Sequence, residues 1–338
     1  MSISKVAKLA GVSSSTVSRV INNHPRVAPE TSDAVKKAMK KLGYTPSERR
    51  PGPKPASRSR VASIAFLVLG TSSNRATPGF EELLRGVSSG ALSNGLSLTF
   101  GHVPDPEHLP QNIIDLRLEG VLLHGATPGP EIRRILQRLP TVWLMGNRRR
   151  PDWGDQVMPD SYEIGNLAAR YLVGRGHKQL AFLNLDGNFW PFRLYYQAFA
   201  AAVSGEDATV TRIERTPDPM AGYWPVHQPE LVKELVQNFL ATSPRPTGLF
   251  VADDMQVAMI QPALQAAGVE IGEGKTEIIS CNNERPYLVG LSPRPAVIDI
   301  RVESIGRRGI EQLIWRLDHS NVEERIVATV EPFIVPNP

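Results

Sequence analysis

Residues 2–46, SISKVAKLAGVSSSTVSRVINNHPRVAPETSDAVKKAMKKLGYTP, decide the fold at the start of this chain. Apolar residues recur there at helical spacing, which predicts three short helices. Gly11 is placed to end the first helix in the left-handed conformation, and Ser13 is a natural N-cap for a second helix over 14–22. Pro29 suits the first turn of the third helix. This order, with a tight turn between the first two helices, is typical of a helix-turn-helix domain.

The second helix is the predicted recognition helix, which lies in the major groove in such domains. Val17, Val20 and Ile21 form its apolar face, so its polar residues lie on the outside. Arg19 could donate two hydrogen bonds to a guanine, while short serines can serve either base type. Ser13 and Thr16 suit phosphate contacts. The DNA-binding residues predicted on this segment are Ser13, Ser14, Ser15, Thr16, Ser18, Arg19 and Asn22.

The charge distribution also indicates a nucleic-acid-binding head on a different body. Residues 1–60 hold 13 Lys or Arg and 3 Asp or Glu, a net charge of +10. Residues 61–338 hold 25 and 31, a net charge of −6. A basic module attached to a mildly acidic domain is typical of nucleic-acid-binding proteins.

The exact order of residues in the head is more specific than its helical pattern. Ala7 to Asn22 follows the pattern A-x-x-A-G-V-S-x-x-T-V-S-R-V-[IL]-N, and Leu42 to Pro46 follows L-G-Y-x-P. The segment closely resembles the DNA-binding domain of the lactose-repressor (LacI/GalR) family of bacterial transcription regulators. One departure is Ala28, where the family usually has a serine that caps the third helix. We expect this departure to cost a little stability and to leave the fold unchanged.

The linker, residues 47–60, departs from the family pattern. In that family it is a short hinge helix that inserts a leucine into the minor groove. Here prolines at 51, 53 and 55 disfavour a helix, and the segment has no leucine. One alternative is a semi-rigid extended spacer. The other is that basic residues follow phosphates or enter a narrow minor groove, among them Arg49, Arg50 and Lys54.

From Val61 onward, short apolar runs alternate with amphipathic stretches. This alternation predicts parallel sheets covered by helices, and a break in the middle indicates two similar halves. Such sheets bind ligands at the carboxyl ends of their strands, and two facing halves make a cleft. The predicted strands are 61–69, 96–100, 120–125, 141–145, 179–184, 208–213, 247–252, 276–281 and 296–300.

The body also resembles the lactose-repressor family, through Asp160–His177, Val251–Ala258, Ile278–Asn283 and Arg301–Arg308. The resemblance implies an α/β periplasmic-binding-protein-like effector domain of two parallel-sheet subdomains. It implies these boundaries: DNA-binding domain 1–46, linker 47–60, and effector-binding and dimerisation domain 61–338. Within the last, subdomain one would be about 61–160 and 291–319, and subdomain two about 161–290 and 320–338.

By family position, effector contacts fall on Asp160, Tyr195, Asp253 and Asn282. The last three depart from the family, which usually has arginine, asparagine and aspartate there. Arg193 could substitute for the missing arginine, whereas Trp190 and Phe192 could stack on a sugar ring or lie in the core. The ends of the predicted strands add Thr71, Ser73, Asn74, His124 and Asn147, each of which could also be an ordinary loop residue.

Carboxylates, amides and aromatic rings together suit a neutral sugar or polyol, although purines and small acids are alternatives. The predicted function is a ligand-responsive transcription regulator, a repressor that binds a pseudo-palindromic double-stranded DNA operator as a homodimer. One alternative is a solute-binding receptor whose DNA binding is secondary, and another is a regulator that no longer senses a sugar. A third is an enzyme with Asp160 and Asp253 as paired carboxylates.

Other features narrow the class of protein. The N-terminus is polar within four residues, and no run approaches the roughly 20 apolar residues of a membrane span. The single cysteine, Cys281, excludes an internal disulfide and a cysteine-rich metal site. No dinucleotide-binding, Walker A, zinc-protease or nucleophile-elbow motif occurs. We therefore expect a cytoplasmic protein with no enzymatic activity, cofactor, metal or membrane partner.

Overall fold

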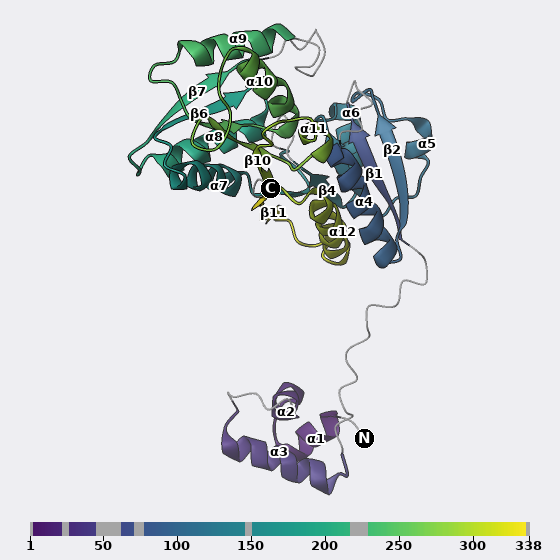
Figure 1. Cartoon of the computed structure of the whole chain (residues 1–338). Coiled ribbons are helices and arrows are strands. Elements are labelled where there is room, and N and C mark those ends of the chain that lie inside the picture. The colour runs from purple at the N-terminus through teal and green to yellow at the C-terminus, as the bar shows by residue number, and fades with distance from the viewer. Residues whose placement is uncertain are drawn as a thin grey trace. The chain divides into compact units, whose positions relative to one another are not determined.

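The structure is a computed structural model of the chain, and it describes residues 3–21, 27–44, 62–70, 78–145, 151–216 and 229–335. The chain divides into two compact units, residues 1–60 and 61–338 (Figure 1). The predicted linker 47–60 lies outside the described residues.

Unit 1 contains the three predicted helices, α1 (Ile3–Ala10), α2 (Ser14–Ile21) and α3 (Pro29–Lys41). Gly11 has a φ of 68°, so the turn between α1 and α2 uses the left-handed conformation predicted for it. The three helices share a small core of Val6, Ala7, Val17, Val20, Val35 and Ala38. The helix-turn-helix prediction is therefore confirmed.

Unit 2 contains two six-stranded sheets, which we call sheet A and sheet B. In sheet A all strands are parallel, in the order β11 (Val327–Val330), β5 (Asp155–Pro159), β4 (Thr141–Leu144), β3 (Gly120–Gly125), β1 (Ser63–Leu69) and β2 (Ser97–Val103). In sheet B the order is β12 (Phe333–Val335), β10 (Ala296–Asp299), β9 (Glu277–Cys281), β8 (Gly248–Val251), β6 (Gln179–Asn184) and β7 (Thr209–Glu214). Only β12 runs antiparallel to its neighbour within sheet B.

Helices cover both faces of each sheet. The sheet A half carries α4 (Pro78–Ser93), α5 (Gln111–Ile114), α6 (Pro130–Leu136) and α12 (Val302–Asp318), and α4 packs along α12. The sheet B half carries α7 (Ser161–Gly174), α8 (Trp190–Val203), α9 (Pro229–Ala241), α10 (Asp254–Ala266) and the short α11 (Arg285–Leu288). Figure 1 shows the helices grouped around their own sheets.

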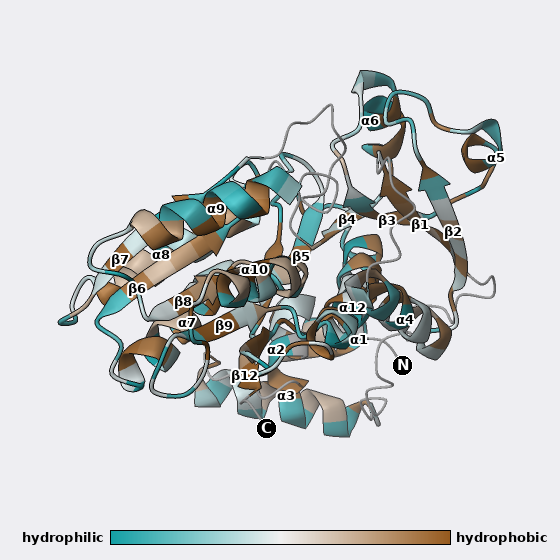
Figure 2. Cartoon of the chain, turned by 45° about the horizontal axis from the view of Figure 1, so that its top comes forward, coloured by the Kyte–Doolittle hydropathy of each residue, from teal (hydrophilic) through white to brown (hydrophobic). Residues whose placement is uncertain are grey.

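The alternation of side chains along β1 explains why this strand is apolar from Ile64 to its end. Ile64, Phe66 and Val68 lie in the core shared with α4 and α12. The intervening Ala65 and Leu67 lie in a second core, which includes residues of α5 and α6. Successive side chains of a strand point to opposite faces, so a strand with helices on both sides is apolar at every position (Figure 2).

Strands β5, β11 and β12 were not predicted from the sequence. Strand β5 begins with Asp155, which is buried and forms an ion pair with Arg316 of α12 at 2.5 Å. A five-residue strand that begins with a charged residue contains only a short apolar run, so its hydrophobic pattern does not predict a strand. Strands β11 and β12 are also short, and β11 alternates between half-buried and exposed positions.

The predicted subdomain boundaries near the C-terminus were wrong. Residues 291–299 were assigned to subdomain one, but β10 pairs with β9 in sheet B. Residues 327–330 were assigned to subdomain two, but β11 pairs with β5 in sheet A. The chain crosses between the halves after β5, between β10 and α12, and between β11 and β12, because strand pairing places each segment in its sheet.

Candidate functional site

The outer face of α2 is a compact polar surface. Ser13 caps the helix, since its hydroxyl accepts a hydrogen bond from the Thr16 backbone N–H at 3.1 Å. The Ser13 hydroxyl also lies 2.7 Å from the Ser15 hydroxyl and 2.8 Å from that of Thr16. Ser14, Ser15 and Arg19 are exposed, because Val17 and Val20 anchor the opposite face in the core. The helix therefore presents three of its predicted DNA-binding side chains, Ser14, Ser15 and Arg19, to solvent.

Helix α3 begins as the sequence predicted, without a side-chain cap. Ala28 occupies the N-cap position with φ −60° and ψ 139°, and no side chain accepts from the first turn. Four exposed lysines follow on the outer part of this helix: Lys36, Lys37, Lys40 and Lys41. They give unit 1 a positively charged helix surface, which suits a polyanion.

The predicted effector residue Asp253 lies at the carboxyl end of β8 in a buried hydrogen-bond network. Its carboxylate caps α10 by accepting from the Gln256 backbone N–H at 2.7 Å and from the Gln256 side-chain amide at 3.2 Å. Gln256 in turn accepts from the Leu185 N–H at 2.7 Å, next to the end of β6. Asn184, the last residue of β6, donates to Glu214 at the end of β7 at 3.0 Å. The network therefore joins three neighbouring strand ends of sheet B.

Tyr195 and Phe192 both lie in the hydrophobic core beneath this edge. Their rings are 5.7 Å apart, and burial raises the pKa of the Tyr195 hydroxyl, with Cys281 and Asp253 adding to the shift. The phenol therefore lies close to the ends of β8 and β9. Asn282 follows β9 with a φ of 107°, a conformation that few residues other than glycine adopt. Tyr195, Asp253 and Asn282 are thus brought together at one edge of sheet B.

The remaining predicted effector residues are placed separately. Asp160 caps α7 by accepting from Tyr162 N and Glu163 N, both at 3.0 Å. Arg193 is exposed on α8 and donates to the Gly187 carbonyl at 3.0 Å, and Trp190 is half-buried at the start of the same helix. His124 lies near the end of β3 in sheet A, with Nδ1 at 3.2 Å from the Leu144 carbonyl. Burial lowers the pKa of its imidazole.

Several predicted residues cannot be placed. Asn22, Arg49, Arg50, Lys54, Thr71, Ser73, Asn74 and Asn147 lie outside the described residues, as does the side chain of Ser18. Asn184 and Gln256 were not predicted as site residues, although both lie in segments that the sequence singles out. Asn184 ends a predicted strand, and Gln256 is three residues after Asp253, where a cap partner is expected.

A second group of polar residues, also missed, lies where β9 meets α10. Asp254 is buried, and its carboxylate is hydrogen-bonded by the Ser280 hydroxyl and by the Glu284 backbone N–H, the latter at 2.6 Å. Burial raises the pKa of Asp254 to about 8 and that of Asp253 to about 7. Both shifts are increased by the charge of Glu284. This end of sheet B therefore favours neutral carboxyl groups over a full set of negative charges.

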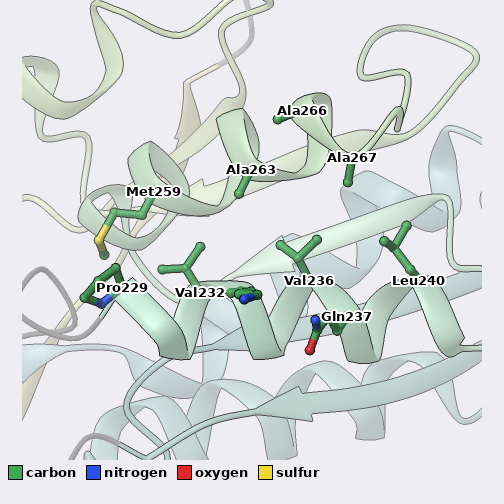
Figure 3. Close-up of a pocket in the computed structure, with 10 residues that line it drawn as sticks. Pro229, Val232, Val236, Gln237, Leu240, Met259, Ala263, Ala266 and Ala267 are labelled. Carbon is green, nitrogen blue, oxygen red and sulfur yellow. The ribbon is translucent and has the colours of Figure 1, made fainter.

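No cluster of three or more His, Cys, Asp or Glu residues within the described ranges has the geometry of a metal site. A groove of about 720 Å³ lies between α9 and α10, and apolar side chains form most of its lining. In Figure 3, Val232 and Val236 of α9 point toward α10, which contributes Met259 and Ala263. This groove is distinct from the polar network at the strand ends. None of the described helices is long and apolar enough to cross a membrane.

Comparisons with known proteins match one family model to unit 1 and another to part of unit 2. Residues 2–47 match the family model of bacterial regulatory proteins of the lacI family, and residues 169–336 match the model of the periplasmic binding protein-like domain. The chain is 27% identical over 335 residues to the HTH-type transcriptional repressor PurR of Mannheimia succiniciproducens, covering 96% of this chain and 94% of that protein. It is 26% identical over 328 residues to the ribose operon repressor of Escherichia coli, covering 95% and 94%.

The fold is also similar to solved structures. The structure described as the transcriptional regulator CelR–cellobiose complex superposes with a TM-score of 0.64 at 21% identity, covering 99% of this chain and 98% of that one. These relatives are named as transcriptional regulators or repressors, and the two family models match the unit that contains the recognition helix and part of the unit that contains the two sheets. The chain therefore combines a DNA-binding domain of the lacI family with a periplasmic-binding-protein-like domain, and it is a ligand-controlled, DNA-binding transcription regulator.

Proposed function

We propose that this regulator is a repressor that binds a pseudo-palindromic operator as a homodimer, with α2 of each copy in one major-groove half-site. The observation that carries the proposal is the outer face of α2, where Ser14, Ser15 and Arg19 are exposed above a buried apolar face. One eight-residue helix reads only a few base pairs, so a specific site needs two copies related by a twofold axis.

The side chains on α2 have different tasks in this proposal. Arg19 offers a guanidinium that can donate two parallel hydrogen bonds to a guanine. Ser13 and Thr16, which already bond to each other at 2.8 Å, suit phosphate contacts at the start of the helix. The lysines of α3 would add attraction that does not depend on sequence.

The test is selection of binding sites from random double-stranded DNA with the full chain, followed by titration on the selected site. We expect a pseudo-palindrome whose affinity falls steeply with salt concentration. Arg19→Ala should weaken binding by about 1–3 kcal/mol and relax sequence preference at one position in each half-site. Lys37→Ala, on the exposed face of α3, is the matched control and should leave the preference unchanged. Operator affinity that is the same in Arg19→Ala and the unmodified chain would refute the recognition-helix assignment.

We further propose that the effector is a neutral sugar or polyol bound at the strand ends of sheet B, in contact with Asp253, Asn282 and Trp190. The buried carboxyl groups there disfavour an anionic ligand, whereas sugar hydroxyls can both donate to them and accept from amides. The names of the ribose operon repressor and of the CelR–cellobiose complex agree with this class of ligand. A regulator of operator DNA acts where the chromosome is, so we infer a cytoplasmic location.

A thermal-shift screen of the full chain against sugars, sugar phosphates and purines tests the effector class. A ligand at one hundred times its dissociation constant should stabilise the chain by about 2.7 kcal/mol. Trp190→Ala should reduce the shift, while Trp315→Ala, a half-buried tryptophan of α12 stacked on His319, should not. Stabilisation by purines or sugar phosphates in place of neutral sugars would contradict the proposed class.

A further inference from the structure

One hydrogen bond crosses between the two halves of unit 2. The backbone N–H of Gly79, in the first turn of α4, donates to the Glu284 carboxylate at 2.8 Å. Helix α4 packs on β2 and α12 in the sheet A half, whereas Glu284 follows β9 of sheet B. The first turn of a helix has free N–H groups and a partial positive charge, so it is a natural partner for a carboxylate.

Glu284 is held from the sheet B side as well. Its own backbone N–H donates to the Asp254 carboxylate at 2.6 Å, and Asp254 is also bonded by Ser280 of β9. Glu284 is only 8% exposed. A continuous path of hydrogen bonds therefore runs from β9 and the start of α10, through Glu284, to the start of α4.

The path is rich in acidic groups. The hydrogen bonds that reach Asp253, Asp254 and Glu284 from described residues come from backbone amides and from the side chains of Ser280, Gln256 and Asn282, with no lysine or arginine among them. The charged and titratable groups that face these three carboxyls are Asp186 after β6, Tyr195 on α8, Glu82 on α4 and Cys281 at the end of β9. Glu82 in turn faces Asp299 at the end of β10 and Arg285 on α11.

We propose that the Glu284–Gly79 contact is a latch between the two halves of the effector unit, and that it closes with uptake of a proton by Glu284, beside the buried carboxyls of Asp253 and Asp254. Three neighbouring buried carboxyls cannot all be ionised at low cost. Burial raises the pKa of Glu284, and this effect outweighs the Gly79 N–H, which lowers it. Opening the halves would hydrate Glu284 and allow it to ionise, so high pH favours the open arrangement.

Three crossings of the chain connect the halves. Two halves that are joined in this way can move relative to each other about a hinge. The regulatory consequence rests on the function proposed above. If the effector acts through the same movement, operator affinity becomes sensitive to pH, because the proton and the effector bias one equilibrium.

The direct test measures the distance between the halves in the full chain, without DNA or effector. The double variant Leu92→Cys, Val289→Cys carries one spin label on α4 of the sheet A half and one beside α11 of the sheet B half, so the distance between the labels reports the distance between the halves. Both sites are accessible to the label, because Leu92 is 82% exposed and Val289 is 85% exposed. The native Cys281 is fully buried and should not label. Pulsed electron resonance should give one short distance at low pH and an added longer population at high pH.

Two substitutions separate the latch from general damage to the fold. Glu284→Gln keeps an acceptor for Gly79 and has no proton to lose, so it should keep the short distance at every pH. Glu284→Ala should show the long population even at low pH. Glu81→Gln, an exposed carboxylate on α4, is the control and should follow the parent chain.

Distances in the parent chain that do not change with pH would overturn the proposal, and so would a Glu284→Gln variant that retains the full pH response. Neither result depends on operator binding. Failure of the latch and failure of the proposed regulatory function can therefore be told apart.

Discussion

Asp253 and Gln256 hold each other in place at the start of α10. The Gln256 backbone N–H donates to one carboxylate oxygen of Asp253 at 2.7 Å, and its side-chain amide donates to the other at 3.2 Å. Both residues are buried. The carboxyl group that family position assigns to the effector is therefore oriented by the helix itself, before any ligand is present.

Loss of Asp253 should therefore cost more than loss of an ordinary cap. In Asp253→Ala the cap is lost, at about 1 kcal/mol, and the buried Gln256 amide loses a partner, at a further cost of about 1–3 kcal/mol. Asp160→Ala is the matched variant, because Asp160 caps α7 from a half-buried position, and it should cost only about 1 kcal/mol. Denaturant unfolding of both variants measures the difference, and equal losses would show that the Gln256 contact adds nothing.

The buried carboxyl of Asp254 should make stability fall as pH rises. Its pKa is raised to about 8 in the folded chain from an ordinary value of 3.8, with burial as the first cause. Between those values the folded state holds a proton that the unfolded state has released, so this stabilisation is complete below about pH 4 and lost by about pH 8.

Asp254→Asn removes this proton and should flatten the stability curve by up to about 1.4 kcal/mol per pH unit. Unfolding free energies at pH 6, 7 and 8.5 give the comparison, with Glu81→Gln as the exposed control. Parallel curves for Asp254→Asn and the parent chain would mean that Asp254 is already ionised at pH 6.

The close packing of α4 on α12 should depend on Gly86. A Cβ atom added there would lie 2.0 Å from the Glu303 backbone carbonyl oxygen, a group that cannot move without moving its helix. We expect Gly86→Ala to destabilise unit 2 by at least about 1–3 kcal/mol through overpacking. Gly174→Ala is the control, since no atom lies within 4 Å of its added Cβ. It should be neutral or stabilising by up to about 1 kcal/mol. A Gly86→Ala variant as stable as Gly174→Ala would contradict the contact.

The missing cap of α3 can be restored. Ala28 already has the extended backbone that an N-cap serine needs, with φ −60° and ψ 139°. Ala28→Ser should stabilise α3 by about 0.5–2 kcal/mol, visible as slower hydrogen exchange of its amides in the full chain. Ala34→Ser, at an exposed position inside α3, should give no gain. Equal exchange rates in Ala28→Ser and the parent chain would show that the new hydroxyl does not cap.

The recognition helix could be predicted because the interactions that form it join residues close together in the sequence. The cap at Ser13, the left-handed Gly11 and the buried Val17 and Val20 involve residues within a few positions of each other, so the sequence indicated the recognition helix directly. The residues of the proposed effector site were harder to predict from the sequence. Asp253 was found by family position, but Asn184, which is joined to it through Gln256, is 69 positions away and comes near it only after sheet B has formed.

 Gln256 and Asn184 are 72 positions apart in the sequence, yet the Gln256 amide lies 3.5 Å from the Asn184 side-chain oxygen in the folded chain. A contact of this kind leaves no local pattern in the sequence.

The sequence by itself determined the three helices of unit 1, the glycine turn between the first two and the apolar strands of unit 2, because caps, turns and side-chain periodicity act over a few residues. Only the tertiary structure decided which sheet β10 and β11 join, and it alone revealed β5, whose Asp155 is balanced by Arg316 on a distant helix. The contact of Glu284 with Gly79, 205 positions away, was decided in the same manner. Strand partners and buried charges are chosen by energies that exist only once distant segments meet, so their pairing is a property of the folded chain.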